Sequence, residues 1–320
     1  MPTPPDAPTT LLVARAEPAA DGIQLFELRH PEGAALSPFE PGAHLAVRVP
    51  GGALRTYSLC GDPADTSHYL LAVKRDAAGR GGSIGFVDGV RPGDTIEVSA
   101  PRNLFALVTA APSFIFVAGG IGITPIVSMI HWLRANGDKP FRLYYLTRNP
   151  AGTAFLDLLA DEALRSRVVI HHDNGIPDNA FDLWPVFEQP SKAHIYCCGP
   201  RPLMDAVRDM TGHWPTSQVH FEDFGAGLVR PRADDAPFTI RLARSGAVLD
   251  VPVGATILEA LRTHGLQAPS SCESGTCGTC RTGLLSGDVD HRDLVLTQAE
   301  RPRAIMVCVS RGTGELVLDL

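Results

Sequence analysis

The chain has 320 residues, of which 44% are hydrophobic and 20% charged, and a formal net charge of −7 at pH 7. This length predicts two or three domains, and the composition is typical of globular proteins. The acidic balance argues against a nucleic acid partner, because phosphate contacts need a concentrated basic surface. No apolar run reaches the ~18 residues of a membrane span, and the proline-rich start lacks the apolar core of a secretion signal. We therefore expect a cytoplasmic protein without a membrane partner.

Short segments with alternating apolar and polar residues follow one another from Leu11 to about Val108. They include LFEL, HLAVRV, YSLC, YLLAVKR and TIEVS, and Gly, Pro and Asp separate them. Patterning with a period of two residues at this spacing predicts an antiparallel β-barrel or sandwich. We assign residues 1–108 to this first domain.

One segment of this domain, RTYSLCG, carries side chains suited to a cofactor. Strand alternation places Arg55 and Tyr57 on one face and Thr56 and Ser58 on the other. An arginine can hold a phosphate, a tyrosine can cover a ring edge, and a serine can hydrogen-bond a heterocycle nitrogen.

A glycine-rich stretch follows in the same domain. Gly81, Gly82 and Ser83 precede a predicted helix, whose free N–H groups can bind a phosphate. From these residues alone, an ordinary solvated barrel edge is the alternative interpretation.

From Ser113 the pattern changes to strands that alternate with helices. FIFVA, FRLYYLT, RVVIHH and HIYCCG are apolar strand candidates, and PIVSMIHWLRANG, AFLDLLADEALRS and PLMDAVRDM have helical patterns. This alternation predicts an α/β domain with a parallel sheet covered on both faces, and we assign it residues 109–226.

The turn in VAGGIGITPIVSM connects the first of these strands to its helix. Gly119, Gly120 and Gly122 allow a tight turn and a close backbone approach. Thr124 can cap the helix and Pro125 fits its first turn, so that free N–H groups face a pyrophosphate. Simple turn chemistry between a strand and a helix is the alternative interpretation.

A second loop ends the strand HIYCCG. It contains Cys198, Gly199 and Pro200 and begins another helix. Ligands of open α/β sheets bind beyond the carboxyl ends of the strands, where both loops are expected to lie. The two loops together predict a crevice for a dinucleotide.

A stretch rich in Gly, Pro and charged residues separates the last part of the chain, and we assign residues 227–236 to a linker. Residues 237–320 contain the strand candidates FTIRLA, VLDVP and GELVLDL and the helix candidate TILEALRTHG. We therefore expect a third domain of α+β type.

Three thiols lie close together in CESGTCGTC, within this third domain. The spacing is Cys272-x4-Cys277-x2-Cys280, and Cys308 follows after 27 further residues. This is the plant-type ferredoxin spacing for the four ligands of a 2Fe-2S cluster. A structural zinc site is the alternative, but such sites usually pair two C-x2-C knuckles.

The motifs R-x-Y-S, a glycine cradle, G-G-I-G-I-T-P, C-G-P and a terminal plant-type ferredoxin, in this order, resemble the phthalate dioxygenase reductase family. The resemblance covers essentially the whole chain. It implies an FMN-binding barrel, an NAD-binding domain and a 2Fe-2S ferredoxin domain of β-grasp type in one polypeptide. It also implies that electrons pass from NADH through FMN and the cluster to a separate Rieske-type aromatic-ring oxygenase. We expect a monomer.

The resemblance also implies roles for individual residues. Ser58, Thr124 and Cys198 are the candidate catalytic residues, with Ser58 near the reactive flavin nitrogen and the other two near the nicotinamide. Phe224 is expected to cover the flavin ring, and a plain core phenylalanine is the alternative. The expected FMN contacts are Arg55, Thr56, Tyr57, Ser58, Val73, Lys74, Arg75, Arg80, Gly81, Gly82 and Ser83, and the expected NADH contacts are Gly119, Gly120, Gly122, Thr124, Asp173, Gly199 and Pro200.

The end of the strand RVVIHH bears on the choice of nucleotide. His172 and Asp173 stand where NADP-using relatives carry a Ser-Arg pair, and a carboxylate repels a 2′-phosphate, so we expect NADH. Arg148, just after the strand YYLT, can also reach a phosphate, so NADPH stays open as an alternative substrate. Adjacent His171 and His172 point to opposite faces of a strand and are not expected to share a metal ion.

Two other functions remain open from the sequence. An equivalent reductase can serve a haem monooxygenase, and a redox-sensing iron–sulfur flavoprotein would carry the same cluster. Phthalate as the substrate of the partner oxygenase follows from the resemblance alone. The residues support FMN over FAD only through the single phosphate cradle.

Overall fold

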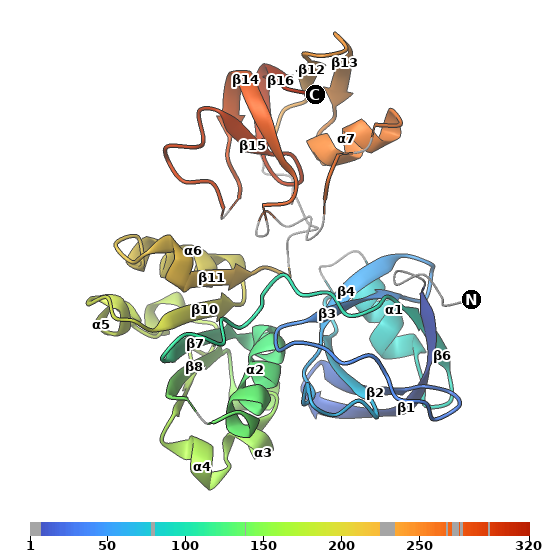
Figure 1. The fold of residues 1–320 in the computed structure, drawn as a ribbon, viewed down its shortest axis with the longest axis vertical. Coiled ribbons are helices and arrows are strands. Elements are labelled where there is room, and N and C mark those ends of the chain that lie inside the picture. The colour runs from blue at the N-terminus through green and yellow to red at the C-terminus, as the bar shows by residue number, and fades with distance from the viewer. Residues whose placement is uncertain are drawn as a thin grey trace. The chain divides into compact units, whose positions relative to one another are not determined.

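The computed structural model describes residues 8–77, 81–137, 139–224, 234–266, 268–270, 275, 278–293 and 295–320. The chain forms two compact units, Met1–Glu222 and Asp223–Leu320, here called the N-terminal and C-terminal units (Figure 1). The described residues contain no helix long and apolar enough to cross a membrane.

A six-stranded antiparallel sheet in the order β4-β3-β6-β1-β2-β5 opens the N-terminal unit. An isolated bridge between Leu59 and Leu71 joins the end of β4 to β5, the two edge strands, and so closes the sheet as a barrel. Apolar side chains that alternate along the strands, such as Phe26 and Leu45, fill its interior together with Phe86 of α1. The elements are β1 Thr9–Ala20, β2 Ile23–Arg29, β3 His44–Arg48, β4 Leu54–Ser58, β5 Tyr69–Lys74, α1 Gly82–Gly89 and β6 Thr95–Val98.

A five-stranded sheet in the order β11-β10-β7-β8-β9 follows, and all its strand pairs are parallel. The predicted strands are confirmed. The elements are β7 Phe114–Gly119, η1 Gly120–Gly122, α2 Ile123–Ala135, β8 Phe141–Thr147, η2 Pro150–Gly152, α3 Leu156–Leu159, α4 Glu162–Arg165, β9 Val168–His172, η3 Pro177–Asn179, α5 Trp184–Phe187, β10 His194–Cys198, α6 Arg201–Met210, η4 Thr216–Gln218 and β11 Val219–Glu222.

The prediction of one continuous helix over AFLDLLADEALRS is wrong, because the segment forms the two short helices α3 and α4. Phe155 has a φ of 61° at the start of α3. Asp161 caps α4, with its side chain accepting the N–H of Ala163. A capping aspartate inside a helical pattern starts a new helix, because it offers the backbone an alternative hydrogen bond.

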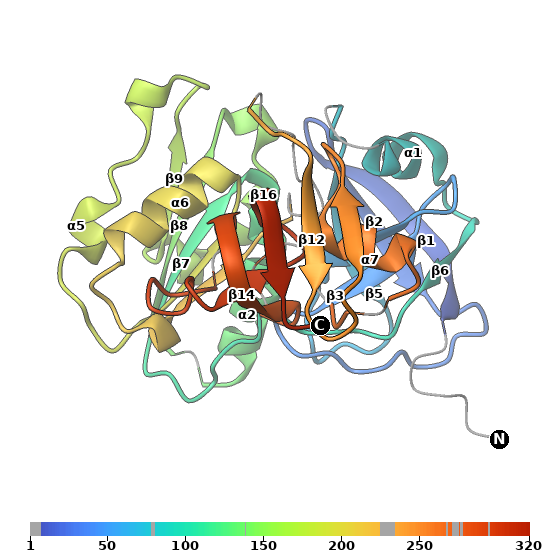
Figure 2. The same ribbon diagram turned by 90° about the horizontal axis from the view of Figure 1, so that it is seen from above.

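The barrel and the parallel sheet share one hydrophobic core. Cys60 and Ala72 of the barrel region pack in the same cluster as Ile126 and Ile130 of α2. Figures 1 and 2 both show the barrel and the parallel sheet side by side. The two layers therefore form one rigid support for any site that lies between them.

The C-terminal unit has its own core and its own five-stranded sheet, in the order β13-β12-β16-β14-β15. Its helix begins at a capping box, in which Thr256 and Glu259 each bind the backbone N–H of the other. The predicted linker lies largely outside the described residues. The elements are β12 Phe238–Leu242, β13 Val248–Val251, α7 Ile257–Thr263, β14 Arg281–Asp290, β15 Ala304–Met306 and β16 Arg311–Leu318.

A buried arginine forms hydrogen bonds between the segment that precedes β12 and the sheet of this unit. Arg311 is 2% exposed, and its guanidinium donates to the carbonyl oxygens of Ala255 at 2.6 Å and Ala236 at 3.0 Å. The carboxylate of Asp235 lies 3.7 Å away and compensates the buried charge.

A pair of histidines lies on the edge of the parallel sheet. His220 of β11 stacks on Tyr196 with ring centroids 4.4 Å apart, and its Nε2 lies 3.0 Å from Nδ1 of His194. Burial, followed by the nearby charge of His194, lowers the pKa of His220 to about 4. The folded unit thus holds the His220 ring neutral.

We expect the N-terminal unit to lose stability as the pH falls from about 6.5 to about 4. In this range the unfolded chain binds a proton on His220 that the folded unit does not bind, so the free energy of unfolding falls with pH. The variant His220→Gln should weaken this dependence, and His213→Gln, at an exposed position, should not. Thermal unfolding followed by tryptophan fluorescence measures this unit alone, because all 3 tryptophans lie in it. An unchanged pH dependence in His220→Gln would show that other groups cause it.

Candidate active site and cluster site

Two residues of β4 face the helix α1. A Cβ added to Gly82 would lie 2.8 Å from Nε of Arg55, so the arginine side chain lies across the first turn of α1. Tyr57 stacks on Phe86 of the same helix, with centroids 5.4 Å apart. These contacts confirm that Arg55 and Tyr57 share one face of the strand, while Thr56 is exposed on the other.

The N-terminus of α1 has the form of a phosphate cradle. Gly81 caps the helix with a φ of 80°, and the first turn carries no acidic residue. The hydroxyl of Ser83 accepts the N–H of Asp76 at 3.1 Å and so fixes the loop that enters the helix. The free amides of the first turn together with the Arg55 guanidinium fit one phosphate group. Arg80 lies outside the described residues.

The three predicted contacts that follow β5 have different environments. Val73 is buried in the barrel core and Lys74 is exposed. Arg75 donates three hydrogen bonds of 2.8–3.0 Å to the carboxylate of Asp88 at the other end of α1. Its guanidinium is thus occupied by a protein partner, and its contact with FMN stays a prediction.

Ser58 brings the barrel into contact with the parallel sheet. It is 4% exposed, and its hydroxyl donates to Oε2 of Glu222 at 3.2 Å. Glu222 ends β11, where it pairs with Cys198 of β10. This carboxylate is not among the predicted site residues. Its position at the carboxyl end of a strand, where ligands of such sheets bind, was the available signal.

The two glycine loops of the parallel sheet touch backbone to backbone. A Cβ on Gly122 would lie 2.1 Å from the carbonyl oxygen of Cys198, and one on Gly119 would lie 2.5 Å from Cδ of Pro200. A Cβ on Gly199 would lie 2.8 Å from Cα of Gly119. Only glycine fits at these three positions, so the loops that start α2 and α6 form one joint wall at the sheet edge.

Thr124 does not cap α2, and this prediction is wrong. The capping position is Gly122, and the Thr124 hydroxyl donates instead to the carbonyl of Ile121 at 3.0 Å. The short 3-10 turn at Gly120–Gly122 leads directly into α2, which begins at Ile123, before Thr124. Thr124 therefore lies inside the first turn of the helix, and its side chain is 2% exposed. Pro125 lies in the first turn as predicted. Helix N–H groups still face the sheet edge, which suits a pyrophosphate.

Asp173 occupies a tight turn after β9. One of its carboxylate oxygens accepts the N–H of Gly175 at 2.7 Å, and Asn174 between them has a φ of 54°. His172 binds the Thr147 hydroxyl at 2.8 Å, whereas His171 binds the carbonyl of Asn179 at 2.7 Å. The two histidines thus have separate partners, as expected for adjacent strand residues.

Two of the four predicted cluster ligands lie together in the C-terminal unit. Cys280 and Cys308 are 3% and 2% exposed, with their Sγ atoms 3.0 Å apart, and neither forms a disulfide within the described part of the chain. Two buried reduced thiols that face each other fit a pair of metal ligands. Cys272 and Cys277 lie outside the described residues.

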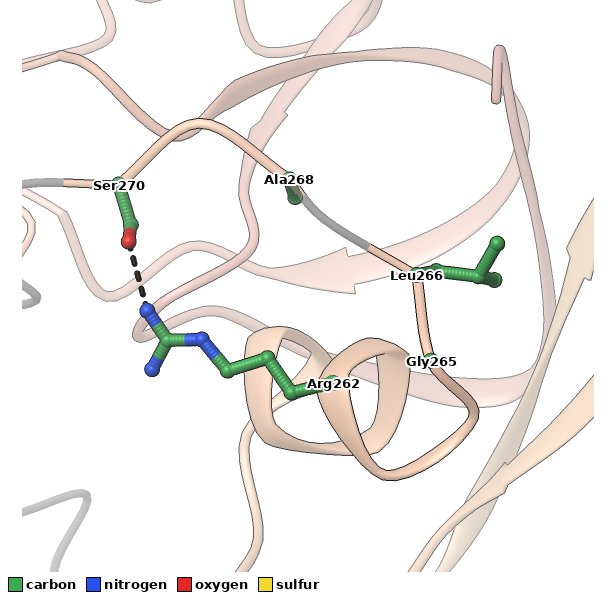
Figure 3. Close-up of a pocket in the computed structure, with 5 residues that line it drawn as sticks. All are labelled: Arg262, Gly265, Leu266, Ala268 and Ser270. Atoms are coloured by element: carbon green, nitrogen blue, oxygen red, sulfur yellow. Dashed lines mark hydrogen bonds between the residues drawn. The ribbon is translucent and has the colours of Figure 1, made fainter.

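A pocket of about 440 Å³ lies beside the segment that leads to Cys272. Figure 3 shows Arg262 reaching from α7 to the hydroxyl of Ser270, with a hydrogen bond of 2.7 Å, and Leu266 on the other side.

In the C-terminal unit Phe224 is 41% exposed, which contradicts the alternative that it is a core residue. Its contact with a flavin stays a prediction.

These sites define a modular electron-transfer reductase with a flavin barrel, a nucleotide-binding sheet and a ferredoxin unit. Residues 240–312 match the family model described as 2Fe-2S iron-sulfur cluster binding domain. The phthalate dioxygenase reductase of Burkholderia cepacia is 57% identical over 97% of both chains. A solved structure of phthalate dioxygenase reductase, described as modular for electron transfer from pyridine nucleotides to 2Fe-2S, is 56% identical over 98% of both chains, with a TM-score of 0.76.

One further solved structure, an intact type IV self-sufficient cytochrome P450 monooxygenase, is 37% identical over 98% of this chain and 41% of its own, with a TM-score of 0.72. The present chain belongs to the phthalate dioxygenase reductase family. Membership confirms the predicted fold class, the electron-transfer oxidoreductase activity and the cofactors FMN, NADH and 2Fe-2S. The partner of such a reductase is an oxygenase.

We expect Gly122→Ala to impair NADH use without loss of FMN. The added Cβ cannot lie 2.1 Å from the Cys198 carbonyl oxygen, so the two glycine loops must separate. The KM for NADH should rise at least about tenfold, which corresponds to about 1.4 kcal/mol of binding. Ferricyanide reduction and flavin absorbance measure the two properties. Gly212→Ala is the matched control, because a Cβ at this exposed position after α6 would meet only ordinary contacts of 3.5 Å or more and its φ is not left-handed. An unchanged KM would contradict the assigned nucleotide wall.

Proposed function

We propose that this chain is the reductase component of a Rieske-type aromatic-ring oxygenase, with NADH, FMN and the 2Fe-2S cluster acting in series. The contact between Ser58 and Glu222 is the observation that carries the proposal. It joins a barrel strand to the carboxyl edge of the parallel sheet, the edge at which ligands of such sheets bind, and so supports transfer between a flavin on the barrel and a dinucleotide on the sheet. Reactants held by these two layers would meet without a large domain movement.

On the barrel side, Arg55 and the first turn of α1 bind the FMN phosphate, and Tyr57 lies along the ring. The Ser58 hydroxyl is held by Glu222, and it would hydrogen-bond the reactive edge of a flavin bound here. FMN, when bound, takes up the two electrons of one NADH together and releases them singly, which the one-electron cluster requires.

On the sheet side, the wall formed by Gly119, Gly122 and Gly199 admits the nucleotide backbone closely. The first-turn amides of α2 bind the pyrophosphate, because they carry the positive end of the helix dipole. Thr124 and Cys198 are buried beside this wall, and they would exclude water from a nicotinamide bound there.

In the C-terminal unit, the four cysteines Cys272, Cys277, Cys280 and Cys308 hold the cluster. The names of the relatives support a phthalate-type substrate for the partner oxygenase, which this chain does not contact. We propose that the protein acts as a monomer in the cytoplasm. The second candidate, a reductase for a haem monooxygenase, is favoured by the likeness to the self-sufficient P450 chain.

The visible spectrum of the purified protein tests this proposal. We expect absorption bands of flavin and of a 2Fe-2S cluster, and both should bleach within seconds after NADH is added under nitrogen. Supply of the Rieske oxygenase, but not of a haem monooxygenase, should then restore the oxidised spectrum. A colourless protein, or one that contains zinc without sulfide, would contradict the proposal.

Cys280→Ser should remove the cluster and keep the flavin. We expect loss of electron delivery to the oxygenase, while reduction of ferricyanide by NADH stays within about twofold, since ferricyanide accepts electrons directly from the flavin side. Cys197→Ala replaces a buried thiol of the N-terminal unit and should keep the cluster. If ferricyanide reduction vanished together with the cluster, the serial path would be wrong.

The nucleotide preference should depend on Asp173. We expect kcat/KM for NADH to exceed that for NADPH by at least about a hundredfold, because the carboxylate repels the 2′-phosphate. Asp173→Arg should narrow this ratio by about tenfold or more, and Asp178→Arg in the following turn is the control. Steady-state ferricyanide assays with both nucleotides measure the ratio, and equal turnover by the unchanged protein would refute the assignment.

A further inference from the structure

A buried hydrogen bond joins the barrel to the helix that follows the glycine turn. The N–H of Gly42 donates to Oγ of Ser128 at 3.0 Å, and Ser128 is 0% exposed. The same hydroxyl donates to the carbonyl of Pro125 at 2.8 Å. Its proton and one lone pair are therefore both engaged, which fixes the orientation of the hydroxyl.

The loop around Gly42 is tightly held on the barrel side. A Cβ on Gly42 would lie 2.2 Å from the carbonyl oxygen of Phe105 and 2.9 Å from Cε of Met129, and its φ is +93°. The amide of Asn103 donates to the carbonyl of Pro41 at 3.1 Å. The backbone therefore passes the Phe105 carbonyl at a distance that only glycine permits, with the end of the Met129 side chain of α2 on its other contact.

This loop continues directly into the strands that hold Ser58. The carbonyl of Ala43 accepts the N–H of Leu59 at 2.8 Å. His44 is the partner of Ser58 in the antiparallel register of β3 and β4. A displacement of Gly42 is thus passed to Ser58 through paired backbone, which is stiff.

On the other side, Ser128 belongs to the helix that begins at the glycine wall. α2 follows Gly122, whose backbone touches the Cys198 carbonyl. The hydrogen bond that Gly42 donates to Ser128 therefore connects the flavin strand to the nucleotide wall through one buried contact.

We propose that Ser128 is a positioning residue for the transfer from NADH to the flavin, because its hydroxyl sets the spacing between Ser58 and the glycine wall. The inference rests on the proposed function. In the step concerned a C–H bond of NADH breaks, the hydrogen and its two electrons form an N–H bond on the flavin, NAD⁺ leaves, and one proton comes from solvent. Such a transfer needs near-contact geometry, so an error of about 1 Å is enough to slow it strongly.

The test compares full-length holoprotein with Ser128→Ala and Ser128→Thr. Threonine in a helix can keep the same bond to a carbonyl three or four residues earlier, so it should retain both functions of the hydroxyl. Ser128→Cys, which has a weaker acceptor in a similar volume, is measured in parallel and decides the matter if the alanine variant does not fold. Thr211→Ala is the matched control, since Thr211 is also buried but its hydroxyl bonds remain within α6.

Two measurements are made on each variant. Hydrogen exchange of residues 40–43, followed by mass spectrometry, reports the Gly42 bond and does not depend on activity. Stopped-flow absorbance at saturating NADH reports the limiting rate of flavin reduction.

For Ser128→Ala we expect faster exchange of residues 40–43 and a limiting rate reduced about 10- to 100-fold. FMN content should stay unchanged and the KM for NADH should change less than the rate. Ser128→Thr should restore both readouts, Ser128→Cys should fall between, and Thr211→Ala should leave both as in the parent protein.

Unchanged exchange in the alanine and cysteine variants, or a limiting rate within twofold of the parent in spite of faster exchange, would overturn the inference. An equal loss of rate in Thr211→Ala would assign the effect to general stability and overturn it as well. A parent protein that NADH does not reduce at all would instead contradict the proposed function, so the two failures are distinguishable.

Discussion

The contact between the two glycine loops of the parallel sheet sets the geometry of the nucleotide crevice. Gly122 lies so close to the Cys198 carbonyl that no side chain fits between them. This contact fixes where α2 and α6 begin, and hence where their N-terminal amides point. Because the loops touch through backbone atoms, their spacing does not depend on side-chain rotamers. Side-chain contacts become important where the two glycine loops and their helices pack against the barrel.

Several buried contacts hold the barrel and the parallel sheet together, and they differ in kind. The shared apolar cluster supplies most of the cohesion, because burial of apolar area is not directional. Tyr196 adds direction, since its hydroxyl donates to the Ala106 carbonyl at 3.0 Å and accepts the N–H of Val108 at 2.7 Å. Together with the bond from Gly42 to Ser128, these contacts allow one arrangement of the two layers, whereas a purely apolar interface would tolerate sliding.

The sequence pattern predicted most of this fold, because hydrophobic periodicity reports which face of an element is buried. It failed where a local hydrogen bond competes with a helix, as at Asp161, and where a short 3-10 turn shifts a helix start, as at Thr124. The strands β14 and β15 were not predicted. Glycines interrupt the pattern of β14, and Gly287 allows a close approach to Leu316, with a hypothetical Cβ only 2.6 Å from its Cδ2.

The site was less predictable than the fold, since it depends on residues far apart in the sequence. The proximity of Arg55 and Gly82 could be predicted, because phosphate sites need few residues of definite type, and their role in phosphate binding stays a prediction. Glu222 was not, because a single carboxylate at a strand end gains its meaning only from Ser58, 164 positions away. The same holds for Ser128, which looks like an ordinary helix serine until its partner Gly42 is known. Transfer between two bound reactants requires that they lie nearly in contact. Their spacing is determined by pairs of residues that are far apart in the sequence, such as these, and not by local motifs.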